Sequence, residues 1–172
     1  LDRPFRLVIA GSAGGKVRSA AKLVGEAALL SGLWAAQRDD YPITVMTGHS
    51  ISEIVISPDE IDYAAITEPD AIVVLSRDGL AKIGHHLAAL GPGGRVFAVP
   101  EVADLKTEVD VRVVDPKESA VRLGTGTVAL YCIARALAEL GVLPEGAMEA
   151  AALLHASDHA EKNAEAVRAA VT

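Results

Sequence analysis

The chain has 172 residues, of which 51% are hydrophobic and 3% aromatic, and its formal net charge is −7. This balance excludes a disordered chain, and the acidic charge argues against nucleic acid as the main partner, because phosphate binding needs a basic surface. The single cysteine, Cys132, excludes a disulfide within the chain and an iron–sulfur cluster held by it alone. The length predicts one domain over residues 1–172. Neither a membrane span nor a signal peptide is visible, so we expect a cytoplasmic protein.

The chain opens on a strand, a glycine turn and a helix. Residues 6–10 form a short apolar run, and residues 11–16 are mostly small. From residue 17 to 30 apolar residues recur at helical spacing, and Gly32 follows as a stop signal. Residues 33–37 read as a second strand, so the order predicts a βαβ unit with parallel strands. The turn would gather free backbone N–H groups and the positive end of the helix dipole, which suits a phosphate or carboxylate.

The remaining elements alternate as in an α/β fold. Extended segments or strands are predicted at residues 44–56, 71–75, 95–99 and 111–114, with a turn at 57–59. Helices are predicted at residues 78–90, 118–123, 128–140, 145–154 and 158–171. Abundant Ala, Val, Ile and Leu with few aromatics favour helices packed on a parallel sheet. We therefore expect a three-layer, mostly parallel, Rossmann-like sheet with helices on both faces.

The glycine turn matches neither of two nucleotide fingerprints. The pattern G-x-G-x-x-G begun at Gly11 would need glycines where Ala13 and Lys16 stand. A P-loop ending in Lys16 would need glycine at position 10 and serine or threonine at 17. Asp39 lies just past the second strand, where a ribose-binding acid is expected, so a free-standing nucleotide-binding module of the NAD or coenzyme A type is an alternative. Glycines that only permit a tight turn and close packing are the other interpretation.

Motifs along the first eighty residues match the pattern of a known family. A strand is followed by Gly-Ser-Ala-Gly-Gly-Lys-Val at residues 11–17, by a helix with Gly32-Leu33 after it, and by Asp40-Tyr41-Pro42. Ile56-Ser57-Pro58-Asp59 ends a later strand. In these motifs the chain resembles the gamma subunit or domain of the 2-oxoacid:acceptor (ferredoxin) oxidoreductases. Those enzymes use thiamine diphosphate to oxidise pyruvate, 2-oxoglutarate, ketoisovalerate or indolepyruvate, and the order of elements is similar across the whole chain.

The chain departs from the family's turn and loop motifs at four positions. Where the family has Gln and Gly in the turn, the chain has Gly15 and Lys16. Where the family has Arg and Gly in the following loop, the chain has Met46 and Thr47. The resemblance is therefore to a divergent member, and a structural subunit that has lost ligand binding is a further alternative.

The resemblance implies a subunit of a complex that oxidatively decarboxylates a 2-oxoacid to acyl-CoA. Thiamine diphosphate and the iron–sulfur clusters are expected on the alpha, beta and ferredoxin-like delta subunits, with ferredoxin as the electron acceptor. This chain would contribute no catalytic residue, would bind no cofactor firmly and would not turn over alone. A contact with coenzyme A is implied, and the isolated chain could form a homodimer.

The candidate cofactor-binding residues follow from the turn and from the resemblance. They are Gly11, Ser12, Gly14, Gly15, Lys16, Tyr41, Gly48 and His49. Residues 124–127, Gly-Thr-Gly-Thr, are a second anion-friendly turn unless they only cap the next helix. His155 and His159 stand four apart in a predicted helix, but without a third ligand we predict no metal site. Cys132 is expected in the core, and His85 and His86 on different faces of their helix.

Overall fold

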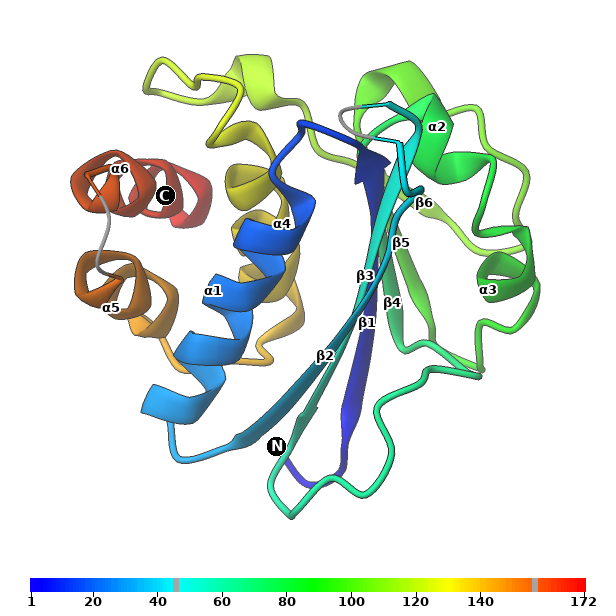
Figure 1. Cartoon of the computed structure of the whole chain (residues 1–172), viewed down its shortest axis with the longest axis horizontal. Helices are drawn as coiled ribbons and strands as arrows, with labels where there is room; N and C mark the ends of the chain where they lie inside the picture. Colours follow the sequence, from blue (N-terminus) through cyan, green and yellow to red (C-terminus); the bar gives the residue numbers. More distant parts are fainter. Residues whose placement is uncertain (45–46, 156–157) are drawn as a thin grey trace.

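The computed structural model describes residues 1–44, 47–155 and 158–172. A six-stranded sheet lies between two groups of helices (Figure 1), with the strand order β2-β3-β1-β4-β5-β6. The strands are β1 (Phe5–Ser12), β2 (Trp34–Asp40), β3 (His49–Ser57), β4 (Ala71–Val74), β5 (Arg95–Ala98) and β6 (Val111–Val113). The helices are α1 (Val17–Leu30), α2 (Arg77–Leu80), α3 (Gly84–Ala88), α4 (Val128–Leu140), α5 (Ala147–Leu154) and α6 (Ala160–Val171), with short 3₁₀ turns η1 (Pro100–Val102) and η2 (Pro116–Glu118).

The sheet is mostly parallel, and one strand runs against the others. β1, β4, β5 and β6 are parallel neighbours, whereas β3 is antiparallel to both β1 and β2. The prediction that the first and second strands pair with each other in parallel is therefore wrong. β1 and β2 do run in the same direction, but β3 is inserted between them. The sequence could not show this, because β3 is buried on both faces and its apolar residues do not alternate.

Helices cover both faces of the sheet. α1 and α4 pack on one face, with α5 and α6 outside them, and α2 and α3 lie on the other face (Figure 1). The stripe of α1 that faces the core is made of small and aliphatic residues, from Val17 to Ala28, which lets the helix approach the sheet closely. Gly32, at φ 75°, follows the end of α1 as predicted. Burying one side chain such as Leu23 contributes about 2 kcal/mol.

Two predicted helices are wrong. Residues 78–90 form two short helices, because buried Ile83 leaves helical geometry at φ −109° and ψ 17°. The first of these helices is seated on β1, where a Cβ on Gly79 would lie 2.5 Å from the carbonyl carbon of Ala10. Residues 118–123 are not helical, since Ser119 is extended and its Oγ accepts from the Val121 N–H, a local bond that competes with a helix.

Other boundaries differ less. The last two helices begin at Ala147 and Ala160, two residues after their predicted starts. Within the described ranges, every helix falls short of the length and hydrophobicity that a bilayer crossing requires.

Candidate functional site

The turn between β1 and α1 is held by hydrogen bonds between backbone groups. Gly14 has φ 83° and Lys16 has φ 61°, and Lys16 is the one non-glycine residue with positive φ in the described ranges. The Gly15 N–H donates to the Ser12 carbonyl at 3.0 Å, and the Ala13 N–H donates to the Gly48 carbonyl at 2.9 Å. A lysine in the left-handed region is uncommon, so the surrounding structure fixes this conformation.

Gly11 is required for packing at the start of the turn. A Cβ at this position would lie 2.6 Å from Cγ2 of Val17, the first residue of α1. Helix α1 can therefore begin close against β1 only if residue 11 has no side chain. This observation supports the interpretation of Gly11 as a packing glycine, and its contact with a cofactor stays a prediction.

Ser12 ends β1, at the place in the sheet where the helices that follow two neighbouring strands lie on opposite faces. β1 leads into α1 on one face, whereas the neighbouring β4 leads into α2 on the other, and α/β folds bind ligands at such a division. The Ser12 hydroxyl lies 2.8 Å from Ser76 Oγ and 3.0 Å from Asp78 Oδ2, both of which can accept its proton. Ser76 Oγ also accepts the Gly79 N–H at 3.1 Å, so the hydroxyl of Ser12 is tied to the cap of α2.

Gly48 and His49 meet the turn because β3 runs antiparallel beside β1. His49 stands opposite Ser12 in the ladder, and Gly48, at φ 83°, accepts the hydrogen bond from Ala13. The Nε2 atom of His49 lies 3.3 Å from Asp40 Oδ2. The structure thus brings Gly48 and His49 together with the glycine turn, although they are more than thirty residues apart in the sequence.

Tyr41 is placed by the first turn of α1. The guanidinium carbon of Arg18 lies 4.5 Å from the centroid of the Tyr41 ring, a cation–π distance. The Tyr41 side chain is exposed, so it is open to a ligand or a partner chain. Met46, which replaces the family's arginine, falls outside the described residues.

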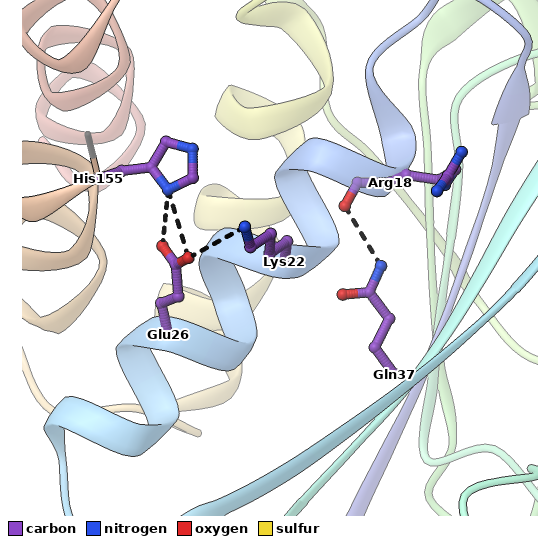
Figure 2. Close-up of polar contacts among 5 residues, drawn as sticks. All are labelled: Arg18, Lys22, Glu26, Gln37 and His155. Carbon is purple, nitrogen blue, oxygen red and sulfur yellow. Dashed lines mark hydrogen bonds and ion pairs between the residues drawn. The ribbon is translucent and has the colours of Figure 1, made fainter. Parts of the chain in front are cut away.

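The acid that a nucleotide-binding module would use is engaged within the chain. Asp39 Oδ1 accepts from Ser52 Oγ at 2.6 Å and from Gln37 Nε2 at 2.9 Å, and Oδ2 lies 3.4 Å from Arg18 Nε. Figure 2 shows Gln37 also donating to the Arg18 carbonyl. Since β3 separates β2 from β1, Asp39 is also two strands away from the glycine turn. Both observations argue against the NAD-type alternative.

A cleft of about 660 Å³ opens beside the turn, between the start of α1, the segment before α4, and α6. Its lining includes Lys16, Arg122 and Lys162, together with residues 124 and 126–127. The two turns that the sequence marked separately as anion-friendly therefore border one cavity. No side chain caps α4, because the hydroxyl of its N-cap Thr127 bonds instead with the backbone of Gly124. Capping of α4 therefore does not account for the Gly-Thr-Gly-Thr turn.

His155 borders the same cleft and is held by α1. Its Nδ1 donates to Glu26 Oε2 at 3.0 Å, and Glu26 also pairs with Lys22 at 3.8 Å (Figure 2). His155 is the C-cap of α5 and His159 is the N-cap of α6, so the predicted shared helix is wrong. No group of three His, Cys, Asp or Glu suited to a metal ion occurs among the described residues.

A second polar cluster lies on the opposite face of the sheet. His86 on α3 is 4% exposed, and its Nε2 donates to Glu53 Oε1 on β3 at 2.8 Å. Burial lowers the pKa of His86, and the hydrogen bond that His86 donates to Glu53 opposes this effect only in part. His85 is exposed whereas His86 is buried, but their ring centroids lie 3.9 Å apart, so the two side chains do not point to different faces of the helix as predicted. The partner Glu53 was missed, although a single acid within an apolar strand was a signal for it.

A family model for pyruvate ferredoxin/flavodoxin oxidoreductase matches residues 6–172. The chain belongs to this family. The match covers the glycine turn, the loop after β2 and the segments that form the cleft. The resemblance drawn from the motifs is therefore confirmed, and the chain is a gamma-type subunit of this oxidoreductase family.

Similar proteins carry related names. Subunit KorC of 2-oxoglutarate synthase from Methanothermobacter thermautotrophicus is 32% identical over 142 residues, covering 80% of this chain and 73% of that protein. KorC from Methanothermobacter marburgensis is 37% identical over 95 residues, covering 55% of this chain and only half of that protein.

Solved structures show the same fold. The gamma subunit of a keto/oxoacid ferredoxin oxidoreductase from Geobacter sulfurreducens has a TM-score of 0.77 at 22% identity, over 98% of this chain and 94% of that one. The 2-oxoglutarate:ferredoxin oxidoreductase of Magnetococcus marinus, with 2-oxoglutarate, coenzyme A and succinyl-CoA bound, has a TM-score of 0.75 at 14% identity. That match covers 99% of this gamma-type chain and 31% of the other chain.

Enzymes of the family use thiamine diphosphate and iron–sulfur clusters, and this gamma-type chain does not fit a cluster. Its single cysteine is buried in α4, and burial raises the pKa of the Cys132 thiol to about 12. Cluster ligands are thiolates, and several are needed. The position of Cys132 in the core was predicted correctly.

Two residues of the cleft were not predicted. Arg122 and Lys162 lie in segments far from the glycine turn, and neither belongs to a recognisable motif. Only the tertiary packing of α6 beside the start of α1 brings them near Lys16.

Proposed function

We propose that this gamma-type chain works in a complex that oxidatively decarboxylates a 2-oxoacid to acyl-CoA and passes the electrons to ferredoxin. The observation that supports this most strongly is the family match, which extends from residue 6 to the last residue. The names of the two similar KorC subunits favour 2-oxoglutarate among the 2-oxoacids. Alpha, beta and ferredoxin-like delta chains are the proposed partners, and the cytoplasm is the proposed location.

The chain's proposed role is to contact coenzyme A and the neighbouring subunits, while thiamine diphosphate and the clusters lie on the partner chains. The lack of a cysteine set supports this division. The proposed contact residues are those of the turn and the adjoining loop, namely Gly11, Ser12, Gly14, Gly15, Lys16, Tyr41, Gly48 and His49. Their gathering at the carboxyl end of β1 supports a shared role. In the absence of its partners, the chain is proposed to act as a single unit over residues 1–172 that forms homodimers.

An activity assay tests this proposal. The purified chain, supplied with 2-oxoglutarate, coenzyme A, thiamine diphosphate, Mg²⁺ and an artificial electron acceptor, is expected to show no turnover. Co-expression with the alpha, beta and delta chains is expected to give a complex that reduces the acceptor, faster with 2-oxoglutarate than with pyruvate. Turnover by the chain alone would contradict the subunit role, and a preference for pyruvate would contradict the substrate assignment.

Thermal unfolding separates this function from the free-standing nucleotide-binding module. The chain is expected to unfold at the same temperature with and without NAD or NADP, since Asp39 is engaged within the chain. A rise in the unfolding temperature with NAD would favour the alternative.

A further inference from the structure

Strand β2 leaves one edge of the sheet open. It is an edge strand in the order β2-β3-β1-β4-β5-β6, and each of its seven residues pairs with β3 on one side. Within the described ranges, the backbone of β2 makes no backbone hydrogen bond other than those to β3. None of its residues is buried, although they include a tryptophan and two alanines. β2 therefore presents a row of backbone N–H and C=O groups that another strand can bond.

The two edge strands of the sheet differ in how well they are protected. Natural edge strands avoid pairing with other chains by being short, by carrying lysine or proline, or by a bulge. β6 has only three residues, whereas β2 has seven, contains neither lysine nor proline, and keeps its register with β3 without a break. The three charged residues of β2, at positions 38–40, each contact a side chain of β3 or α1. The edge of β2 is therefore built to accept a strand about 24 Å long.

The sequence of β2 is complementary to itself in the antiparallel direction. A two-fold axis at Gln37 would use the whole strand and would oppose the pairs Trp34–Asp40, Ala35–Asp39, Ala36–Arg38 and Gln37–Gln37 between two copies. Every charged residue would then stand opposite an uncharged one, so no like charges meet directly. An axis one residue further along, at Arg38, would instead place two guanidinium groups opposite each other, and an axis at Ala36 would shorten the ladder.

The same register covers exposed aromatic side chains at both ends of β2. Trp34 is 49% exposed and Tyr41 is 51% exposed. Arg38 of the second copy would lie diagonally across from Trp34 on the same face, within reach of a cation–π contact. Tyr41, which contacts Arg18 on the α1 side of the sheet, would stand opposite Leu33 of the second copy. Backbone pairing and side-chain burial therefore favour the same arrangement.

We propose that two copies of this chain associate through β2, with the two strands antiparallel and centred on Gln37, so that one continuous sheet runs through the pair. The proposal rests on the proposed function for the homodimer itself, and it adds the surface and the register. The two-fold axis is perpendicular to the sheet, so α1 of both copies lies on the same side of it. Each copy contributes the same residues to the contact. The match of β2 with itself favours a second copy over an unrelated extended segment.

Sedimentation equilibrium of the purified chain tests the association, and charge changes at Ala36 test the register. Ala36 is half-buried and faces Arg38 of the second copy in the proposed pairing. Ala36→Lys creates two like-charge pairs across the axis and is expected to weaken the dimer about tenfold, whereas Ala36→Glu is expected to keep or tighten it. Leu154→Glu is the control, because Leu154 is 70% exposed on α5, which packs against α1 and α6 and not against β2. Circular dichroism checks that each variant folds.

A cysteine at the two-fold axis gives a second, independent readout. Gln37→Cys is expected to form a disulfide between the copies when the oxidant diamide is added, because the two thiols meet at the axis. Ala35→Cys is the matched control on the same face of β2. Its two copies lie about 14 Å apart along the paired strands, which is too far for a disulfide. The native Cys132 is buried, so it does not compete.

The expected result is a dimer that dissociates in the micromolar range, resists Leu154→Glu and cross-links through Gln37→Cys. The proposal is overturned if the chain stays monomeric at about 0.5 mM, if Ala36→Lys and Ala36→Glu dimerise equally well, or if Leu154→Glu abolishes the dimer. It is also overturned if Ala35→Cys cross-links as fast as Gln37→Cys.

The outcome is separable from that of the catalytic role. A chain that stays monomeric alone but gives an active complex with the alpha, beta and delta chains would remove this interface and leave the catalytic function standing. Conversely, a dimer through β2 of a chain that supports no active complex would keep the interface and overturn the function.

Discussion

The two faces of the sheet carry two different polar clusters. On the α3 side, His86 is buried, the side chain of Glu53 is only 12% exposed, and a hydrogen bond of 2.8 Å joins them. On the α1 side, the cleft exposes Lys16, Arg122 and Lys162 without ion-pair partners among the described residues. Glu53 faces away from α1, because its neighbour Ile54 lies beneath Gly25 of that helix and alternate residues of a strand point to opposite faces.

The difference separates a structural cluster from a site. A buried carboxylate is tolerated when a donor reaches it, and removing the donor leaves a charge without compensation. Reversing the charge of an exposed cation changes the stability of the protein little, but it weakens any ligand that the cation binds. The first cluster should therefore be sensitive in stability measurements, and the second in binding measurements.

The largest effect on stability is expected from His86→Ala. The variant removes the hydrogen-bond donor of the largely buried Glu53 carboxylate, leaves it only the Arg38 guanidinium at 3.8 Å, and opens a cavity, so the free energy of unfolding should fall by about 3 kcal/mol. The matched control is His85→Ala, at the exposed neighbouring position, which should change it by less than about 0.5 kcal/mol. Urea unfolding gives both values. Equal losses in the two variants would show that the buried pair is not what stabilises this face.

A slightly smaller loss is expected from Gly79→Ala. The added Cβ would lie 2.5 Å from the backbone of Ala10, which cannot move aside easily, so about 2–3 kcal/mol should be lost. Gly84→Ala is the control in the next helix. No atom lies within 4 Å of a Cβ there, and the variant should be more stable by about 0.5 kcal/mol. A neutral Gly79→Ala would show that α2 is free to shift on β1.

The dependence of the free energy of unfolding on pH, below pH 7.5, should test the His86–Glu53 pair further. Burial lowers the pKa of His86 below 6.5, so the unfolded chain binds this proton more readily than the folded chain. Stability should therefore fall as the pH drops below 6.5, by up to about 1.4 kcal/mol for each unit between the two pKa values. The gap between wild type and His86→Ala should narrow over that range in urea titrations from pH 7.5 to 5. A gap that widens toward acid would mean that the folded state favours the charged imidazole.

The smallest effect on stability is expected on the other face. Lys162→Glu replaces an exposed cation that has no ion pair in the described ranges, so its free energy of unfolding should stay within about 0.5 kcal/mol of wild type. Thermal unfolding without ligand measures this. A loss of more than about 1 kcal/mol would place Lys162 among the structural charges and remove the contrast between the faces.

Much of the fold could be predicted from the sequence because its signals are local. The run at residues 71–75, the periodic helix at 17–30 and its glycine stop all correspond to observed elements. The position of β3 between β1 and β2 is set by tertiary packing, and no local sequence pattern predicts it. The break at Ile83 likewise follows from seating Gly79 on β1, which a helical pattern alone does not reveal.

The candidate site was only half visible in the sequence. The glycine turn and the loop at 48–49 carry family motifs, and the β1–β3 ladder does join them. Arg122 and Lys162 carry no motif, and they become part of a site only because α6 packs against α4 and α5 near the start of α1. The sequence shows that these residues are cations, but only the fold shows whether a cation has an ion-pair partner.

The proposed function is tested most directly by kinetics of the assembled complex carrying Lys16→Glu. The account predicts that the KM for coenzyme A rises about tenfold while the KM for the 2-oxoacid and the stability of the complex stay unchanged. An unchanged KM for coenzyme A, in a complex that assembles and turns over normally, would contradict the assignment of Lys16 to the coenzyme A contact.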